Sequence, residues 1–148
     1  MNTGTFLKVL DARFKATRKV VAAIPSDRLD FKPTPEMMSA RELALHLMGN
    51  YTFLESGLTK NRWDTNAFKV DGKAGSTAEL VSTFDSIYQT ARTNLEKVPD
   101  EAFEQRAKPF GAEQKVSTLV LAMAEHEIQH RGQMQVYLRL MGVKPVNS

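Results

Sequence analysis

The 148-residue chain contains no cysteine, and this absence removes several kinds of chemistry at once. Disulfide bonds, thiolate metal sites and a cysteine nucleophile are all excluded. Any thiol that takes part in a reaction of this protein must therefore arrive on a co-substrate.

Long apolar runs and blocks of basic residues are also missing. No stretch approaches the ~18 apolar residues that a membrane span needs. The first residues, MNTGTFLKVLDARF, lack the charged-then-apolar pattern of a signal peptide. We therefore expect a cytoplasmic protein with no membrane partner. The net charge of +3 comes without any block of five or more lysines and arginines, so we expect no nucleic-acid partner.

What the chain does contain is typical of a globular protein. Apolar residues make up 42% of it and charged residues 25%, which is ordinary for a soluble fold. A chain of this length can bury a sizeable core. We expect one domain that spans residues 1–148.

Four segments carry apolar residues at helical spacing, which predicts an all-α protein. Ser39 with Glu42 and Ser76 with Glu79 match the capping box that opens many helices. Ser117 is the expected N-cap of the last segment. The predicted helices are 3–24, 39–60, 76–98 and 117–141. Four amphipathic helices of this length favour a four-helix bundle.

The segments between these helices are long. Residues 25–38 hold three prolines and predict an extended loop. Residues 61–75 are polar, and their largest apolar groups, Trp63 and Phe68, either cap the bundle or line the mouth of a pocket. Alternation around Phe103 and Phe110 permits a short hairpin before the last helix. Connections this long can cross the bundle, so a simple up-down-up-down order is not required.

The three histidines of the chain fall on inward faces of two predicted helices. His126 and His130 lie one turn apart, within an inward stripe roughly 80° wide on the last helix. At ~1.5 Å per residue, these two and His46 lie at comparable heights along their helices. If the two helices are neighbours, the three rings converge at the middle of the bundle.

Converging imidazoles predict a site for a divalent metal ion. Three neutral ligands leave further coordination positions open, which is the pattern of a catalytic rather than a structural site. Imidazole suits zinc, nickel, iron and copper, so the ligands do not choose the metal. Asn50 and Gln133 lie near the histidines and are candidates for hydrogen bonds to them or for substrate contacts. The alternative is a set of core histidines satisfied by hydrogen bonds without an ion.

Residues 126–130, HEIQH, also match H-E-x-x-H, the metalloprotease signature in which the glutamate is the general base. The surrounding sequence differs from those enzymes, because Gln133 stands where a metzincin has glycine and no histidine follows His130. Glu127 also points about 100° away from His126 on the helix wheel. We therefore interpret Glu127 as a flanking residue or a pocket residue that supports the ligands, and keep the protease as a lesser alternative.

Two segments resemble the DinB-like (DinB/YfiT-like) family of bacterial helical-bundle proteins. They are RELALHLMG around His46 and HEIQHRGQMQVYLRLMGVKP from His126 to Pro145. The resemblance extends over essentially the whole chain. It implies a four-helix bundle with crossover topology, a divalent metal held by His46, His126 and His130, and a homodimer. It also implies a small-molecule substrate, since some relatives are S-transferases or isomerases that use low-molecular-weight thiols.

Two functions follow as hypotheses. The first is a metal-dependent enzyme whose zinc, nickel or iron ion activates a thiol co-substrate or water, giving a thiol S-transferase, an isomerase or a hydrolase. The second is a non-catalytic metal-binding bundle that acts as a binding or stress protein. The two differ in whether the ion keeps positions open to a substrate.

Overall fold

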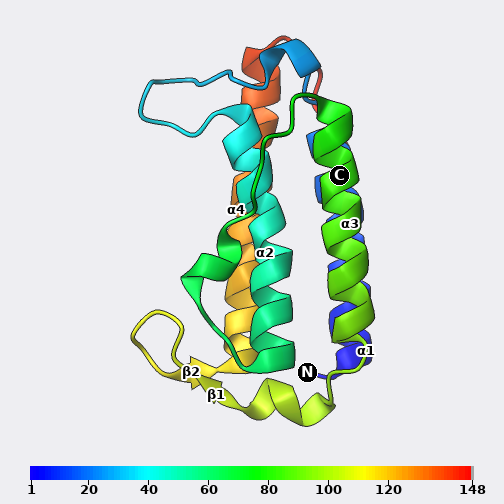
Figure 1. The fold of residues 1–148 in the computed structure, drawn as a ribbon, viewed down its shortest axis with the longest axis vertical. Coiled ribbons are helices and arrows are strands. Elements are labelled where there is room, and N and C mark those ends of the chain that lie inside the picture. Colours follow the sequence, from blue (N-terminus) through cyan, green and yellow to red (C-terminus); the bar gives the residue numbers. More distant parts are fainter. Residues whose placement is uncertain (148) are drawn as a thin grey trace.

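The computed structural model describes residues 1–147. Its main elements are four long helices (Figure 1). They are α1 (Thr3–Ala22), α2 (Ala40–Lys60), α3 (Thr77–Leu95) and α4 (Val116–Leu140). Three short 3₁₀ turns and one pair of short strands lie between them: η1 (Ser26–Arg28), η2 (Thr65–Phe68), η3 (Asp100–Glu104), β1 (Arg106–Ala107) and β2 (Gln114–Lys115). The expected all-α four-helix fold is confirmed.

The order of the helices around the bundle is α1, α3, α2, α4, which differs from their order in the chain. The Thr77 hydroxyl donates to the Ile24 carbonyl at 2.5 Å, which places the start of α3 beside the end of α1. The Tyr137 hydroxyl donates to the Met38 carbonyl at 2.8 Å, which places the end of α4 beside the start of α2. Helix α1 therefore runs antiparallel to α3, and α2 runs antiparallel to α4. Successive helices α1 and α2 face each other across the core.

The connection between α2 and α3 runs back along the whole bundle, so these two helices are parallel (Figure 1). This is the crossover topology that the resemblance implies. The connection lies tightly on α2, because a Cβ at Gly57 would overlap the Trp63 ring and a Cβ at Gly49 would overlap the Phe68 carbonyl. Trp63 and Phe68 thus cover the flank of α2 rather than an end of the bundle.

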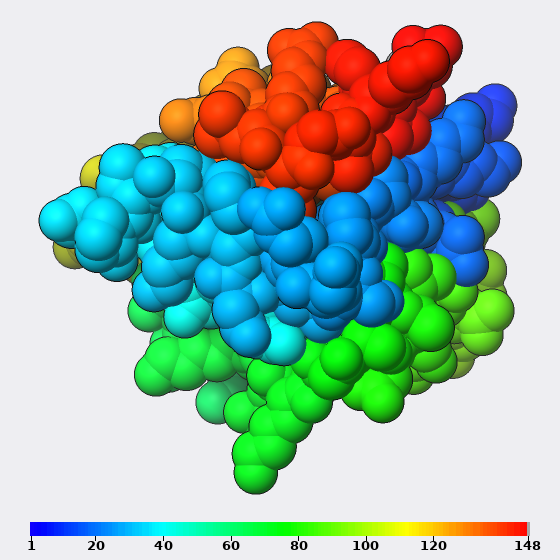
Figure 2. Space-filling model, turned by 90° about the horizontal axis from the view of Figure 1, so that it is seen from above, coloured from blue at the N-terminus to red at the C-terminus, as the bar shows by residue number. Residues whose placement is uncertain are grey.

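The end of the bundle seen in Figure 2 is covered by the connection between α1 and α2. This segment, blue to cyan, lies across the middle between the C-terminal part of α4 and the start of α3. Leu29 within it is only 2% exposed. The extended loop predicted for residues 25–38 is therefore present, apart from the short turn η1, and the loop packs against the core.

The helix starts agree with the sequence at two of three positions. The capping box of Ser39 and Glu42 is confirmed, with hydrogen bonds in both directions. Ser76 accepts from the Glu79 amide as expected, although the Glu79 carboxylate accepts from Gly75 rather than Ser76. The prediction for Ser117 is wrong, because α4 begins one residue earlier, at Val116.

The early start of α4 has a tertiary cause. Strands β1 and β2 pair antiparallel, Arg106 with Lys115 and Ala107 with Gln114, so the expected short hairpin is confirmed. The Val116 amide then donates to the Gln105 carbonyl at 2.9 Å. The hairpin therefore delivers the chain directly into the helix, and no side chain caps α4.

Aromatic rings fill the middle of the core. Phe14 of α1 and Tyr51 of α2 both meet Phe84 of α3 edge to face, with ring centroids 4.9 and 5.2 Å apart. The buried apolar residues of all four helices join in one cluster around these rings. Within residues 1–147, the helices are all too short or too polar to cross a membrane.

Candidate metal centre

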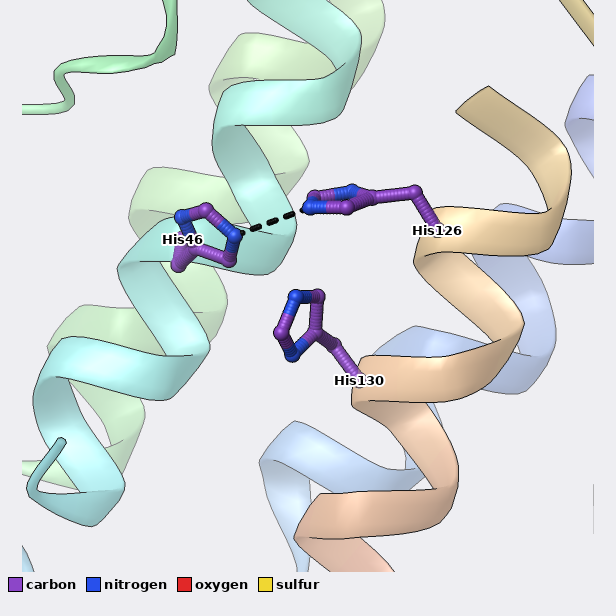
Figure 3. A group of neighbouring side chains, drawn as sticks. All are labelled: His46, His126 and His130. Carbon is purple, nitrogen blue, oxygen red and sulfur yellow. Dashed lines mark hydrogen bonds between the residues drawn. The ribbon is translucent and has the colours of Figure 1, made fainter. Parts of the chain in front are cut away.

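The three histidines meet between α2 and α4 (Figure 3). His46 comes from α2, and His126 and His130 come from successive turns of α4. Their ring centroids lie 4.5 to 4.9 Å apart in every pairing. One nitrogen from each ring lies within 4.8 Å of the corresponding nitrogens of the other two. The convergence expected from the helix faces is therefore present.

These separations fit a shared metal ion. The Nε2 atoms of His46 and His126 are 3.0 Å apart. Two nitrogens that each lie ~2.0–2.1 Å from one ion are separated by roughly 3.0 Å at a right angle and roughly 3.4 Å at a tetrahedral angle. The donor set of three imidazoles also suits zinc, nickel or iron.

Asn50 fixes the orientation of His126. Its Nδ2 donates to the Met123 carbonyl at 3.0 Å, which leaves Oδ1 facing the imidazole. The His126 Nδ1–H donates to this oxygen at 3.0 Å. With its proton on Nδ1, the ring presents the Nε2 lone pair toward His46 and His130. Asn50 is fully buried, so this arrangement is held firmly.

Gln133 does the same for His130. The His130 Nδ1–H donates to Gln133 Oε1 at 2.9 Å, one turn along α4. Two of the three imidazoles thus have their Nδ1 atoms engaged by amide oxygens. Hydrogen bonds of this kind orient metal-binding histidines and make them better ligands. Asn50 and Gln133 both lie where the sequence pattern placed them.

Two of the three histidines, His46 and His126, have lowered pKa values. Burial, followed by the proximity of His130 and of His46, lowers the pKa of His126 to about 4. Burial, followed by the proximity of His130, also lowers the pKa of His46. A neutral imidazole offers a free lone pair, so the lowered pKa values of His46 and His126 favour metal binding near pH 7.

Phe68 forms an apolar flank of the site. Its ring stacks beside His46 with centroids 6.0 Å apart and meets His126 at 5.7 Å. The other side of Phe68 stacks on the buried Phe53 at 4.5 Å. The Thr52 hydroxyl donates to the Ala67 carbonyl and holds this segment on α2. The sequence left open whether Phe68 caps the bundle or lines the mouth of a pocket, and did not indicate that its ring meets the histidines.

Glu127 lies elsewhere than expected. Its side chain is fully buried and points into the core between α1 and α2. Oε1 accepts from the Thr17 hydroxyl at 2.6 Å and the Tyr51 hydroxyl at 2.7 Å, while Oε2 pairs with Arg13. This differs from a flanking or pocket residue beside the ligands. A carboxylate engaged by three donors on the core side is not placed to act as the general base of an H-E-x-x-H enzyme.

The partners of Glu127 were not identified from the sequence. Arg13 is 8% exposed and Thr17 is fully buried, although helix α1 otherwise carries its charged residues outward. The available signal was their position, four residues apart on the same side as Leu10 and Phe14. Burial, together with the Glu127 charge and hydrogen bond, raises the pKa of Tyr51 well above its ordinary value, so Tyr51 remains a donor.

Comparisons with known proteins agree with this architecture. The uncharacterized protein YjoA of Bacillus subtilis is 27% identical over 131 residues, which cover 85% of this chain and 82% of that protein. The crystal structure of the DinB-like protein YjoA covers 97% of this chain and 96% of its own, with a TM-score of 0.80 at 21% identity. A DinB-like protein from Bacillus cereus gives 0.79 at 18% identity, with 97% of this chain and 95% of its own covered.

Because both sequence identities are low, the two structural similarities support the fold alone. Family membership is decided by the sequence itself. The sequence model of the DinB family matches residues 1–148, from the first helix through the histidine pair of α4. The chain therefore belongs to the DinB family.

Proposed function

We propose that His46, His126 and His130 together bind one divalent metal ion, with zinc, nickel and iron as the candidates. The observation that carries this proposal is the convergence of one nitrogen from each ring to within 4.8 Å. The Nδ1 hydrogen bonds to Asn50 and Gln133 support it, because they aim lone pairs at the common centre. Family membership supports it as well.

We further propose that the bound ion serves an enzyme rather than a structural role. A divalent ion on three neutral imidazoles supplies a Lewis acid with open positions, which makes a thiol or water a better nucleophile near neutral pH. Because the chain has no cysteine, the thiol belongs to a low-molecular-weight co-substrate. The reaction class is then S-transfer or isomerisation with a thiol, or hydrolysis with water.

The residues around the histidines have separate tasks in this proposal. Asn50 and Gln133 hold the rings in one tautomer and orientation. Phe68 shields one side of the site from water and offers an apolar surface to a small substrate. Water exclusion strengthens electrostatic interactions at such a site.

Metal analysis tests the binding step. Protein purified without a metal-affinity tag is to be loaded with zinc, nickel or iron(II) and measured by elemental analysis. We expect near-stoichiometric metal in the natural protein and its loss in His126→Ala. Gln129→Ala changes an exposed residue of the same helix and serves as the control. Equal metal content in all three proteins would contradict the proposal.

Turnover separates the enzyme from the non-catalytic alternative. Metal-loaded protein is to be tested for conjugation of a small electrophile to glutathione, bacillithiol or mycothiol, and for hydrolysis of model esters and amides. We expect activity that disappears in the metal-free protein. Stoichiometric metal without any turnover would instead support a binding or stress protein.

We also propose that the protein forms a homodimer through α4. The outer face of this helix carries four apolar residues that are each at least half exposed: Leu121, Ile128, Val136 and Leu140. Gly132 lies among them, and a Cβ at that position would meet nothing within 4 Å. An apolar stripe with a small residue at its middle suits close packing against a second copy of the same helix.

A further inference from the structure

We infer that Glu127 is a positioning residue. It fixes the rotation of α4 about its own axis and its position along that axis, so that His126 reaches the metal centre. The residues involved are Arg13, Thr17, Tyr51 and Glu127, called here the Glu127 network. The expected effect on metal binding rests on the proposed function. The geometric claim itself concerns only residues of this chain.

The Glu127 network joins three helices at one buried carboxylate. Arg13 and Thr17 come from α1, Tyr51 from α2 and Glu127 from α4. The side chains of Arg13 and Glu127 are 9% and 0% exposed. Hydrogen bonds to a buried charge are strong and directional. Apolar packing alone would tolerate small rotations of α4, whereas this carboxylate accepts its three donors in only one arrangement.

The rotation that Glu127 fixes is the rotation that His126 needs. Adjacent helix residues project about 100° apart. When Glu127 points into the core between α1 and α2, His126 must point along the seam between α2 and α4, where His46 stands. A rotation of α4 that released Glu127 would also turn His126 and His130 away from His46.

A second path connects the network to the histidine through direct contacts. Arg13 Nη2 donates to the Met123 carbonyl at 3.2 Å as well as pairing with Glu127. The same carbonyl accepts from Asn50 Nδ2 at 3.0 Å. Asn50 Oδ1 in turn accepts from His126 Nδ1. The guanidinium and the amide that orients the metal ligand therefore share one acceptor.

A buried ion pair could also be a purely structural feature, and the two roles make different predictions. Replacing both members of a buried pair with apolar residues is often neutral or stabilising. The double variant R13M/E127L therefore removes the directional contacts while leaving a packed core. A structural role predicts that such a variant behaves normally at the histidines. A positioning role predicts that the histidines lose their order even though the protein is stable.

The first readout needs no metal. Nitrogen NMR of the metal-free protein reports which imidazole nitrogen carries the proton. We expect His126 in the natural protein to be held as the Nδ1–H tautomer, and R13M/E127L to show a mixture of tautomers. Tyr51→Phe keeps both charges and the ring, and we expect it to shift the tautomers in the same direction to a smaller degree. It serves as the test if the double variant does not fold.

The second readout is zinc affinity, measured by competition with a chelator at a temperature where every variant is folded. We expect R13M/E127L to bind zinc roughly tenfold more weakly than the natural protein, in line with losses seen when residues behind metal ligands are replaced. The matched control is R18Q/D85N, which removes the ion pair between Arg18 and Asp85 on α1 and α3. This control should keep the natural tautomer and zinc affinity.

The outcomes separate the inference from the proposed function. A stable R13M/E127L protein with the natural His126 tautomer would overturn the inference, as would the natural tautomer in a folded Tyr51→Phe protein. If the natural protein fails to bind zinc, nickel and iron(II), the proposed function fails, while the tautomer measurement still decides whether Glu127 positions His126.

Discussion

The Asn50 side chain lies between the Met123 carbonyl and His126, and it bonds to both. Its Nδ2 donates to that carbonyl and its Oδ1 accepts from His126 Nδ1, each at 3.0 Å. One amide therefore joins the backbone of α4 to a side chain of the same helix, from a position on α2. This relationship fixes which nitrogen of His126 faces the other two histidines.

Replacement of Asn50 should therefore weaken metal binding without removing a ligand. We expect Asn50→Leu to lower zinc affinity by roughly 10- to 100-fold, because His126 loses the acceptor that holds its proton on Nδ1. Isothermal titration calorimetry of the metal-free protein measures this change. Asn94→Leu is the control, since Asn94 bonds to Glu55 on the far part of the bundle. Equal affinities for the two variants would show that Asn50 does not orient His126.

Two glycines of the bundle should respond in opposite directions to the same substitution. A Cβ at Gly49 would overlap the Phe68 carbonyl, so Gly49→Ala must push the segment that carries Phe68 away from α2. We expect a loss of about 1–3 kcal/mol in the free energy of unfolding. Gly132 has open space around it in the single chain, so Gly132→Ala should add up to ~1 kcal/mol at concentrations where the protein is monomeric. Urea unfolding monitored by circular dichroism compares them, and a gain in both would argue against the tight contact at Gly49.

The stability of the metal-free protein should fall in mild acid because of His126. The pKa of this histidine is about 4 in the folded state and 6.5 when unperturbed. Between these values the unfolded chain binds more protons than the folded protein, so stability rises with pH. The free energy of unfolding that depends on neutral His126 is fully present above about pH 7 and is lost as the pH falls toward 4.

Urea midpoints between pH 4 and 8 measure this dependence, and His126→Gln isolates it from the titration of carboxylates. The difference between the natural protein and His126→Gln should change with pH in the window between 4 and 6.5. A difference that stays constant across this window would mean that His126 titrates normally in the folded protein.

A charge on the outer face of α4 should break the proposed homodimer. Ile128 is 52% exposed in the single chain, so Ile128→Glu should not disturb the fold. Burial of this carboxylate against a second copy is costly, and we expect a shift from dimer to monomer. Light scattering after size-exclusion chromatography measures the mass. Gln89→Glu adds the same charge at an exposed position of α3, away from the proposed interface, and is the control. A natural protein that is already monomeric at high concentration rules out the dimer.

The sequence predicted the helices and the histidine cluster because both depend on local rules. Apolar spacing defined the helices, and Ser39 with Glu42 marked the start of α2 through contacts only three residues apart. His126 and His130 shared a face of one helix, and His46 pointed inward on another at a comparable height. The convergence then required only that α2 and α4 be neighbours, which the fold provides.

The features that sequence reasoning missed depend on distant partners. Arg13 and Glu127 are 114 positions apart, and no local pattern pairs a basic residue of the first helix with an acidic residue of the last. The start of α4 followed the hairpin at Val116 rather than the capping preference of Ser117, because the backbone there is already held by Gln105. Tertiary contacts decided these positions and overrode residue preference.

X-ray absorption spectroscopy of the zinc-loaded protein tests the central claim most directly, because it reports the atoms around the ion. We predict nitrogen neighbours at ~2.0–2.1 Å with the outer-shell scattering of three imidazoles, and loss of one imidazole in each of His46→Ala, His126→Ala and His130→Ala. Zinc surrounded by oxygen alone, or a spectrum that the three substitutions leave unchanged, would contradict the three-histidine site.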